Sequence, residues 1–247
     1  MRFILGVLLA LWFTPVSAQF NGCPAGFCSP KSSGTVGPPT VTTQAIFVAA
    51  SGGGSSTYTW SSVSTGTAFS TRRVIGITGS SSGATFVSCT IGGINCDVSQ
   101  INGTDGTQEV IYIISAVVPT GTTANFVINW SSGQFGGGRL FVYTCDNSLL
   151  GSATPITGYN TQASATSATA TTTTLSNGFV IVYMNGLGGT STAPSVSASS
   201  ETITQDFSYS GASYAGNANG VTASGSNSAT LTWAGSTQSN MILAAWR

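Results

Sequence analysis

The chain has 247 residues, of which only 5% are charged, and it contains no histidine. A chain without histidine excludes Ser-His-Asp and Cys-His nucleophilic sites and imidazole metal sites, and it lacks the commonest general base. Six basic and six acidic residues, with no basic cluster, argue against nucleic acid as a partner. The hydrophobic content of 41% is still sufficient to build a core.

Residues 1–18 have the pattern of a secretory signal peptide. Arg2 supplies the positive charge, residues 3–13 form the apolar run, and Val16-Ser17-Ala18 matches a small-residue cleavage site. The run is too short to span a bilayer, and no other segment reaches the roughly 18 consecutive apolar residues of a membrane helix. We therefore expect a secreted protein, extracellular or on a cell or virion surface, without a membrane span.

Residues 19–43 are predicted to form a cysteine loop followed by a linker. Cys23 and Cys28 flank Pro-Ala-Gly-Phe, and such a pair in an exported protein is expected to form a disulfide. A lipid anchor at Cys23 would need a leucine three residues earlier, and a redox pair would need a two-residue spacer. Pro, Gly, Ser and Thr dominate residues 29–43, which predicts a linker ahead of a domain at 44–247.

Short β-strands are predicted from residue 45 onward. An apolar run at 45–50 ends at three glycines, Tyr58 and Trp60 alternate with Ser and Thr, and a third run covers 73–78. We expect Arg72 and Arg73 to anchor the start of the third strand, with an aspartate or glutamate as partner.

Residues 84–97 predict a β-hairpin with a disulfide. Gly92-Gly93 is a two-residue turn signal, and a turn there places Cys89 opposite Cys96. Opposed residues lie about 4.5–5.5 Å apart at Cα, which a disulfide can bridge. Two buried thiols with a different loop are the alternative. Cys145 is then left over, and a buried small residue at a strand end is its expected state.

Residues 109–145 contain three apolar runs that we expect to form a three-stranded meander, the nucleus of the domain. Residues 124–131 alternate, with Phe126, Ile128 and Trp130 on one face, which is typical of a strand with one wet face. Residues 110–118 are apolar on both faces, so this strand is expected to lie mid-sheet with cover on each side.

In the C-terminal half, the sequence predicts further strands that are separated by loops. Residues 151–177 predict a long connection and then an exposed strand, and residues 179–184 a buried strand. Loops are expected at 186–200 and 211–228, a weaker strand at 203–209, and strands at 229–234 and 241–246. Pairing of the first run, 45–50, with the last, 241–246, would resemble a jelly roll. The fold class we expect is therefore an all-β, antiparallel, jelly-roll-like sandwich.

Carboxylates are the remaining candidates for catalysis. A glycosidase needs two of them on either side of a sugar, but no local motif pairs any of these six: Asp97, Asp105, Glu109, Asp146, Glu201 and Asp206. The turn at 102–106 offers Asp105 as a Ca²⁺ ligand, although a plain turn into a strand is the favoured interpretation. We expect no cofactor and no catalytic residue.

Aromatic residues in polar surroundings are the other candidate site. Trp60, Tyr159 and Trp246 lie in or near such contexts, and packing in the core or at its rim is the simpler role for each. Tyr209 and Tyr214, on either side of Gly211, are the preferred pair for a ligand such as a glycan.

Residues 63–146 resemble a known group of proteins. The segments VSTGTAFSTRRVIGIT, TIGG, VPTGTTANFVINWS and RLFVYTCDN are similar in order and spacing to a β-sandwich domain of phage- and prophage-associated proteins of alphaproteobacteria. The resemblance implies a virion-surface or cell-surface role and identifies no catalytic residues.

The sequence thus favours an exported, non-enzymatic surface protein, a phage-related structural or adhesive module. A carbohydrate-binding module and a glycan-cleaving enzyme with a carboxylate pair are the alternatives. A glycan or a cell-surface or virion component is the expected partner, and the sequence does not specify the oligomeric state.

Overall fold

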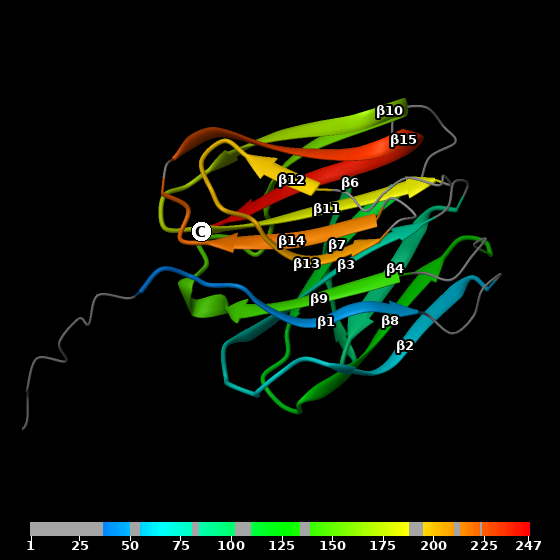
Figure 1. Cartoon of the computed structure of the whole chain (residues 1–247). Coiled ribbons are helices and arrows are strands. Elements are labelled where there is room, and N and C mark those ends of the chain that lie inside the picture. The colour runs from blue at the N-terminus through cyan, green and yellow to red at the C-terminus, as the bar shows by residue number, and fades with distance from the viewer. Residues whose placement is uncertain are drawn as a thin grey trace, which may run out of the picture. The chain divides into compact units, whose positions relative to one another are not determined.

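The structure, a computed structural model, describes residues 37–49, 55–80, 84–101, 110–133, 139–187, 195–209, 213–222 and 224–247. Residues 37–247 belong to one compact unit. The predicted signal peptide, the Cys23 and Cys28 loop and the turn with Asp105 lie outside the described residues. The described chain is all-β apart from a short 3-10 turn, η1 (Asn147–Leu149), which confirms the predicted antiparallel β-sandwich class (Figure 1).

Sheet A has five antiparallel strands in the order β1-β9-β3-β7-β6. Its strands are β1 (Thr42–Ala49), β3 (Arg72–Ser80), β6 (Asp97–Ile101), β7 (Val110–Val117) and β9 (Arg139–Asp146). The middle strands β3, β7 and β9 are buried along nearly their whole length on both faces. The prediction that residues 110–118 are covered on each side is thereby confirmed, since a continuous apolar run suits a fully buried strand.

Sheet B has four strands in the order β2-β8-β4-β5. Its strands are β2 (Thr57–Ser64), β4 (Phe86–Ile91), β5 (Ile94–Asn95) and β8 (Thr123–Trp130). In β8 the side chains of Phe126, Ile128 and Trp130 are buried while alternate residues reach solvent, as their period-2 pattern predicts. Sheet B therefore has one apolar face and one polar face.

Sheet C has the order β10-β15-β11-β14-β13, and β12 pairs with β15 outside that path. Its strands are β10 (Ile156–Thr174), β11 (Phe179–Leu187), β12 (Ser195–Ala198), β13 (Thr204–Tyr209), β14 (Ser213–Asn219) and β15 (Gly225–Trp246). The two longest strands, β10 and β15, pair with each other over most of their length. They form a ribbon that extends well beyond the other strands.

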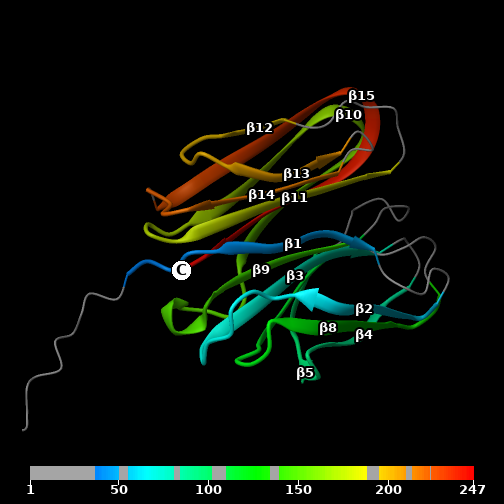
Figure 2. The ribbon, with the colours of Figure 1, turned by 60° about the horizontal axis from the view of Figure 1, so that its bottom comes forward.

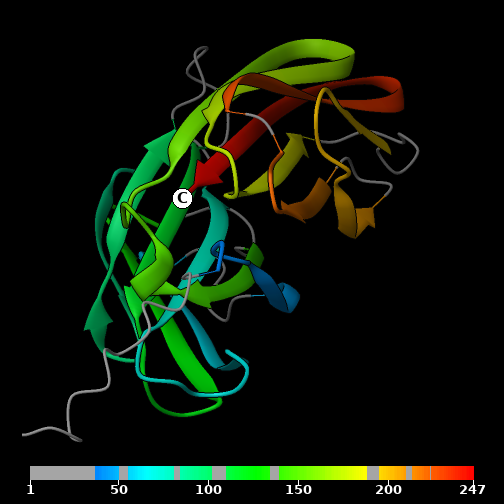
Figure 3. The ribbon, with the colours of Figure 1, turned by 90° about the vertical axis from the view of Figure 1, so that its left-hand side faces the viewer.

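The β10–β15 ribbon folds back over sheet C. Its register shifts between Gln162 and Ser167, which divides it into a proximal half paired beside β11 and a distal half paired with β12. Figures 2 and 3 show the ribbon curving over the sheet. The two halves of β10 touch, because Asn160 Nδ2 donates to the carbonyl of Thr169 at 2.7 Å. The distal half with β12 thus forms a separate outer layer.

Four β layers enclose three apolar cores (Figure 2). Core 1 lies between sheets B and A, core 2 between sheets A and C, and core 3 between sheet C and the distal ribbon. Neighbouring residues show the alternation: Val74 faces core 1 and Ile75 core 2, whereas Ile181 faces core 2 and Val180 core 3. Sheets A and C are therefore each covered on both faces.

The hairpin at Gly92-Gly93 forms as predicted. Ile91 pairs with Ile94 and Thr90 with Asn95, and both glycines have positive φ, as a primed turn requires. Cys89 and Cys96 form the predicted disulfide, with their Cα atoms 5.6 Å apart.

The predicted meander of residues 109–145 is wrong. β7 and β9 lie in sheet A, on either side of β3, and β8 lies in sheet B between β2 and β4. The physical reason is burial: the two strands that are apolar on both faces need cover on each side, whereas β8 has one polar face and belongs in an outer layer.

The C-terminal half also departs from the sequence prediction. β1 pairs with β9 rather than with the last strand, so the pairing on which the jelly-roll comparison rested is absent. The predicted loop at 211–228 contains β14, and the predicted loop at 186–200 contains β12. The connection predicted after residue 151 is shorter than expected, because β10 already begins at Ile156. Strand β1 begins at Thr42, three residues earlier than expected.

Substitution of Gly158 can test whether the two halves of the β10–β15 ribbon are in contact. A Cβ at this position would collide with the carbonyl oxygen of Thr171 on the opposite half of β10. We expect Gly158→Ala to lower the free energy of unfolding by about 3 kcal/mol, at the upper end of overpacking effects, as measured by urea denaturation. Gly37→Ala, where an added Cβ meets nothing within 4 Å, is the control and should shift stability by less than about 0.5 kcal/mol. Equal effects of the two variants would refute the contact between the halves.

Candidate functional site

Asp206 lies at the junction of sheets A and C, at a bulge in β13 between Gln205 and Phe207. Its carboxylate accepts hydrogen bonds from Tyr143 Oη at 3.0 Å, Thr43 Oγ1 at 2.8 Å and Asn217 Nδ2 at 2.9 Å. The first two donors belong to sheet A and the third to sheet C. A charged acceptor makes these bonds stronger than neutral ones, so Asp206 joins two layers of the stack.

Two buried tyrosines near Asp206 remain protonated. Burial, and then the charge of Asp206 and its hydrogen bond, raise the pKa of Tyr143 well above its usual value. Burial, and then the charge of Asp206, also raise the pKa of Tyr214, whose hydroxyl has no hydrogen-bond partner among the described residues. Tyr143 therefore acts as a hydrogen-bond donor to the carboxylate. The raised pKa of each phenol keeps it from acting as a base near neutral pH.

Arg73 and Asp97 form a salt bridge between β3 and β6. Arg73 Nη1 lies 2.7 Å from Asp97 Oδ2 and also donates to Ser115 Oγ, while Nε donates to Asn147 Oδ1. The prediction of an acidic partner is confirmed for Arg73. The Asp97 side chain is 55% exposed, so the pair adds little stability on its own, and its main effect is to fix the edge of sheet A.

Arg72 is a different case, because its partners are carbonyl groups rather than a carboxylate. Its side chain is fully buried, and the guanidinium donates to the carbonyls of Thr65, Gly66, Val118 and Thr120 at 2.8–3.1 Å. Burial lowers the pKa of this guanidinium. Arg72 thus ties together the turns after β2 and β7, and the predicted acidic partner is wrong at this position.

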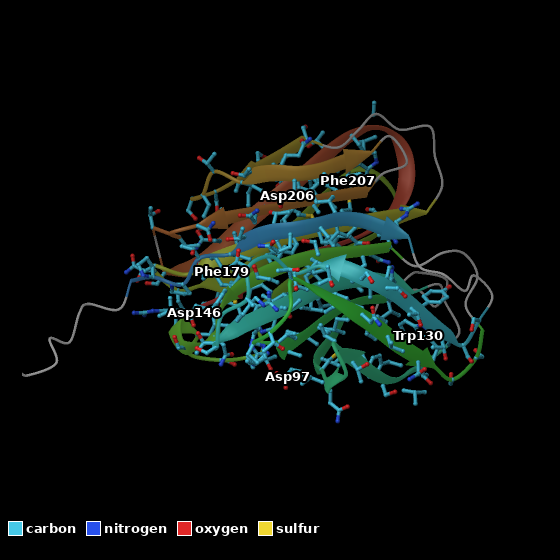
Figure 4. The ribbon with its side chains drawn as sticks, turned by 90° about the horizontal axis from the view of Figure 1, so that it is seen from below. Asp97, Trp130, Asp146, Phe179, Asp206 and Phe207 are labelled. Carbon is cyan, nitrogen blue, oxygen red and sulfur yellow. A yellow bond between two sulfur atoms is a disulfide. The ribbon has the colours of Figure 1, made fainter. Side chains whose placement is uncertain are left out.

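The other described carboxylates also make local contacts. Asp146 Oδ1 accepts from Ser148 N at 2.9 Å and caps η1, and a hydrogen bond from Thr71 is the largest cause that lowers the Asp146 pKa. Ser200 Oγ donates to Glu201. Figure 4 shows Asp97, Asp146 and Asp206 well apart from one another. The carboxylates it labels thus do not form the close pair that glycan cleavage needs, and Glu109 lies outside the described residues.

The predicted aromatic sites are mostly core positions. Trp60, Trp246 and Tyr214 are 96–100% buried, whereas the Tyr159 side chain is 54% exposed. The structure describes only the backbone of Tyr209, which ends β13 opposite Ser213. Tyr214 therefore presents no exposed ring face, so a platform made of both tyrosine rings is not supported.

Cys145 is a buried free thiol at the end of β9, as its sequence context predicts. Burial raises its pKa from 9.0 to about 12, and the nearby charge of Arg73 only partly offsets this. A thiol with such a pKa is not a nucleophile at neutral pH.

The outward side of the distal ribbon is a face lined with hydroxyl groups, which we call the hydroxyl face. It consists of Ser167, Thr169, Thr171 and Thr173 on β10, Ser226, Ser228, Thr230 and Thr232 on β15, and Ser195 and Ser197 on β12. None of these residues carries a charge. The residues between them, among them Ala168, Ala170 and Leu231, point into core 3.

The hydroxyl face is ordered by its strand register. Thr169 of β10 pairs with Thr230 of β15, which in turn pairs with Ser197 of β12, so these three residues form one row across the three strands. The Oγ1 atoms of Thr169 and Thr230 are 2.8 Å apart, as are the hydroxyls of Thr171 and Ser228. In a β-sheet, paired residues on neighbouring strands lie about 4.8 Å apart, and successive residues on the same face of one strand lie about 6.8 Å apart. The face is therefore a regular lattice of groups that can both donate and accept hydrogen bonds.

Sequence reasoning predicted an exposed strand within 151–177 but did not identify this face. The alternation of Ala168 and Ala170 with Ser and Thr was the available signal. The sequence did not reveal that β12 pairs with β15 and extends the face, because the composition of residues 186–200 predicts a loop.

The described part of the chain contains neither a candidate metal site nor a candidate membrane helix. No group of three or more His, Cys, Asp or Glu residues there could hold a metal ion. No helix there is long and apolar enough to cross a bilayer.

No protein-family model, curated protein or solved structure matches the chain.

The junction at Asp206 can be tested by substitution. Asp206→Asn replaces a carboxylate that accepts three hydrogen bonds by an amide, whose NH2 group would face donors rather than acceptors. We therefore expect the free energy of unfolding, measured by urea denaturation, to fall by about 1–3 kcal/mol. Asp97→Asn, which alters an exposed salt bridge, should cost less than about 1 kcal/mol. If Asp206→Asn costs no more than this control, the carboxylate does not hold the layers together.

The buried thiol predicts an alkaline effect on stability. Because the Cys145 pKa is raised from 9.0 to about 12 on folding, its contribution to stability is complete below pH 9 and is lost as the pH rises toward 12. In Cys145→Ala the melting temperature should fall less steeply over this range than in the unchanged protein. Identical slopes in the two proteins would show that Cys145 is not buried in the folded state.

Proposed function

We propose that the protein is an exported, non-enzymatic surface protein that acts as a structural or adhesive module and contacts glycans through the hydroxyl face. The observation that carries the proposal is the lattice of Ser and Thr side chains over β10, β15 and β12, which has no charged member. The signal-peptide pattern of residues 1–18 and the resemblance of residues 63–146 to phage-associated β-sandwich proteins support a location on a cell or virion surface.

The chemistry of the hydroxyl face suits a neutral, hydroxylated partner. Each Ser or Thr hydroxyl donates one hydrogen bond and accepts others, as sugar hydroxyls do. The repeat along the strands suits a partner that is itself repetitive, such as a polysaccharide. Since no charge is present on the face, contact through it should be nearly independent of ionic strength.

An enzymatic role has less support in the described residues. Asp97, Asp146, Glu201 and Asp206 each already bind a neighbouring side chain or cap a turn. Glycan cleavage would require two carboxylates placed across a sugar. The adhesive role makes no such demand.

The test uses three isosteric substitutions on the hydroxyl face: Thr169→Val, Thr171→Val and Thr230→Val. Valine keeps the shape and strand preference of threonine and replaces its hydroxyl by a methyl group. We expect the unchanged protein to be retained on at least one insoluble neutral polysaccharide, among cellulose, chitin and curdlan, equally at low and high salt. The triple variant should bind at least about tenfold more weakly, since it loses several hydrogen bonds.

The matched control carries Thr57→Val, Thr59→Val and Thr90→Val on the polar face of sheet B, at the other end of the stack. It should bind like the unchanged protein. Absence of retention on every polysaccharide, or equal losses in both triple variants, would overturn the assignment of the hydroxyl face. Release of reducing sugar would overturn the non-enzymatic role.

A further inference from the structure

The segment that leads into β1, residues 37–43, is attached to two sheets at once. β1 begins at Thr42 and pairs with β9 of sheet A. Val41, directly before it, is buried in core 2 and is bonded to Asn219, the last residue of β14 in sheet C. Figures 2 and 4 show β1, in blue, between β9 and the strands of sheet C. Because residues 1–36 precede this segment, a pull on them reaches the domain through it.

Asn219 binds the backbone of Val41 as a residue of a neighbouring strand would. Its Oδ1 atom accepts a hydrogen bond from Val41 N at 2.6 Å, and its Nδ2 atom donates to the Val41 carbonyl at 3.0 Å. Two residues of an antiparallel pair exchange the same two bonds. A carboxamide can take the place of one of them because it carries both a donor and an acceptor.

Thr43 makes a second attachment to sheet C. Its Oγ1 atom donates to Asp206 Oδ1 at 2.8 Å and accepts from Asn217 Nδ2 at 3.2 Å. Asn217 also donates to Asp206, so these three side chains form one network. Asn217 and Asn219 lie two residues apart on β14 and therefore face the same way. We call residues 41–43 together with Asn217, Asn219 and Asp206 the latch.

The attachment of the same segment to sheet A is less regular. The pairing of β1 with β9 shifts its register twice, between Thr43 and Ala45 and between Ala45 and Val48. A register shift interrupts the ladder of hydrogen bonds, and β1 is the edge strand of its sheet. The latch lies ahead of this ladder in the chain, so a pull from the N-terminal side meets the latch first.

The latch leads directly to the hydroxyl face through one sheet. β14 pairs with β11 along its whole length, and β11 pairs with β15, without a register shift in either ladder. The distal half of β15 carries part of the hydroxyl face. Sheets A and B lie beside this route rather than on it.

We propose that the latch transmits force: it passes a pull on the N-terminal part of the chain into sheet C and through it to the hydroxyl face. The inference rests on the proposed adhesive role, because such a force arises only while a partner holds the hydroxyl face. Under that force the latch bonds protect core 2, since release of Val41 would expose a side chain that is only 4% exposed in the folded protein.

Single-molecule magnetic tweezers at constant force test the latch without any polysaccharide. The full chain is held by its N-terminus and by a handle on the substitution Thr171→Cys in the hydroxyl face. At the same force, Asn219→Ala should unfold about tenfold faster than the unchanged protein, because two hydrogen bonds are lost. Thr43→Val keeps the shape of the side chain and should also speed unfolding, because it removes the bonds to Asp206 and Asn217.

Two controls separate the latch from a general loss of stability. Asn129→Ala removes two side-chain hydrogen bonds on sheet B, those with Thr57 and Ser88, and should unfold like the unchanged protein. In the second control the force acts between Arg247 and the same handle. This force bypasses the latch, so Asn219→Ala should have little effect on the unfolding rate.

The proposal is overturned if Asn219→Ala unfolds no faster than Asn129→Ala when the N-terminus is pulled. It is also overturned if Asn219→Ala speeds unfolding equally in both pulling geometries. Because the handle replaces the partner, these results do not depend on binding by the hydroxyl face. Lack of retention on every polysaccharide would remove the adhesive role and leave the measured unfolding rates unchanged.

Discussion

Burial of β-strands on both faces is the constraint on which the rest of this structure depends. β3, β7 and β9 in sheet A, and β11 in sheet C, offer no polar face to solvent. Each of these sheets must therefore be covered twice, because exposing either face would leave an apolar surface in water. Sheet B and the distal ribbon supply the outer cover, and they are the layers whose strands alternate between apolar and polar residues.

This layering also determines where polar chemistry can occur. Several charged groups in the described chain lie at junctions: Asp206 between sheets A and C, Arg73 with Asp97 at the edge of sheet A, and Arg72 among turn carbonyls. They are satisfied by the fold itself. The outward face of the distal ribbon carries hydroxyl groups instead, so this face is neutral. The adhesive role that we propose for the hydroxyl face rests on this division.

Local features of this fold could be predicted from the sequence, and features that depend on distant segments could not. The hairpin with Cys89 and Cys96 and the alternation in β8 involve neighbouring residues, and both are confirmed. β8 lies in a different layer from β7 and β9, and this depends on which of the three strands has a polar face that solvent can cover. β14 was missed because its small and polar residues resemble a loop, and only its neighbours β11 and β13 make it a strand. The partners of Asp206 lie up to 163 residues away, so no local pattern could have joined them.

Sheets A and C are the interior layers of the stack, and native-state hydrogen exchange measured by NMR can test this arrangement strand by strand. Slow exchange marks the segments that open only with global unfolding. We expect the slowest exchange for amides of β3, β7, β9 and β11, and faster exchange for β2, β4 and β12. Protection of β7 and β9 no greater than that of β2 and β12 would contradict the four-layer arrangement.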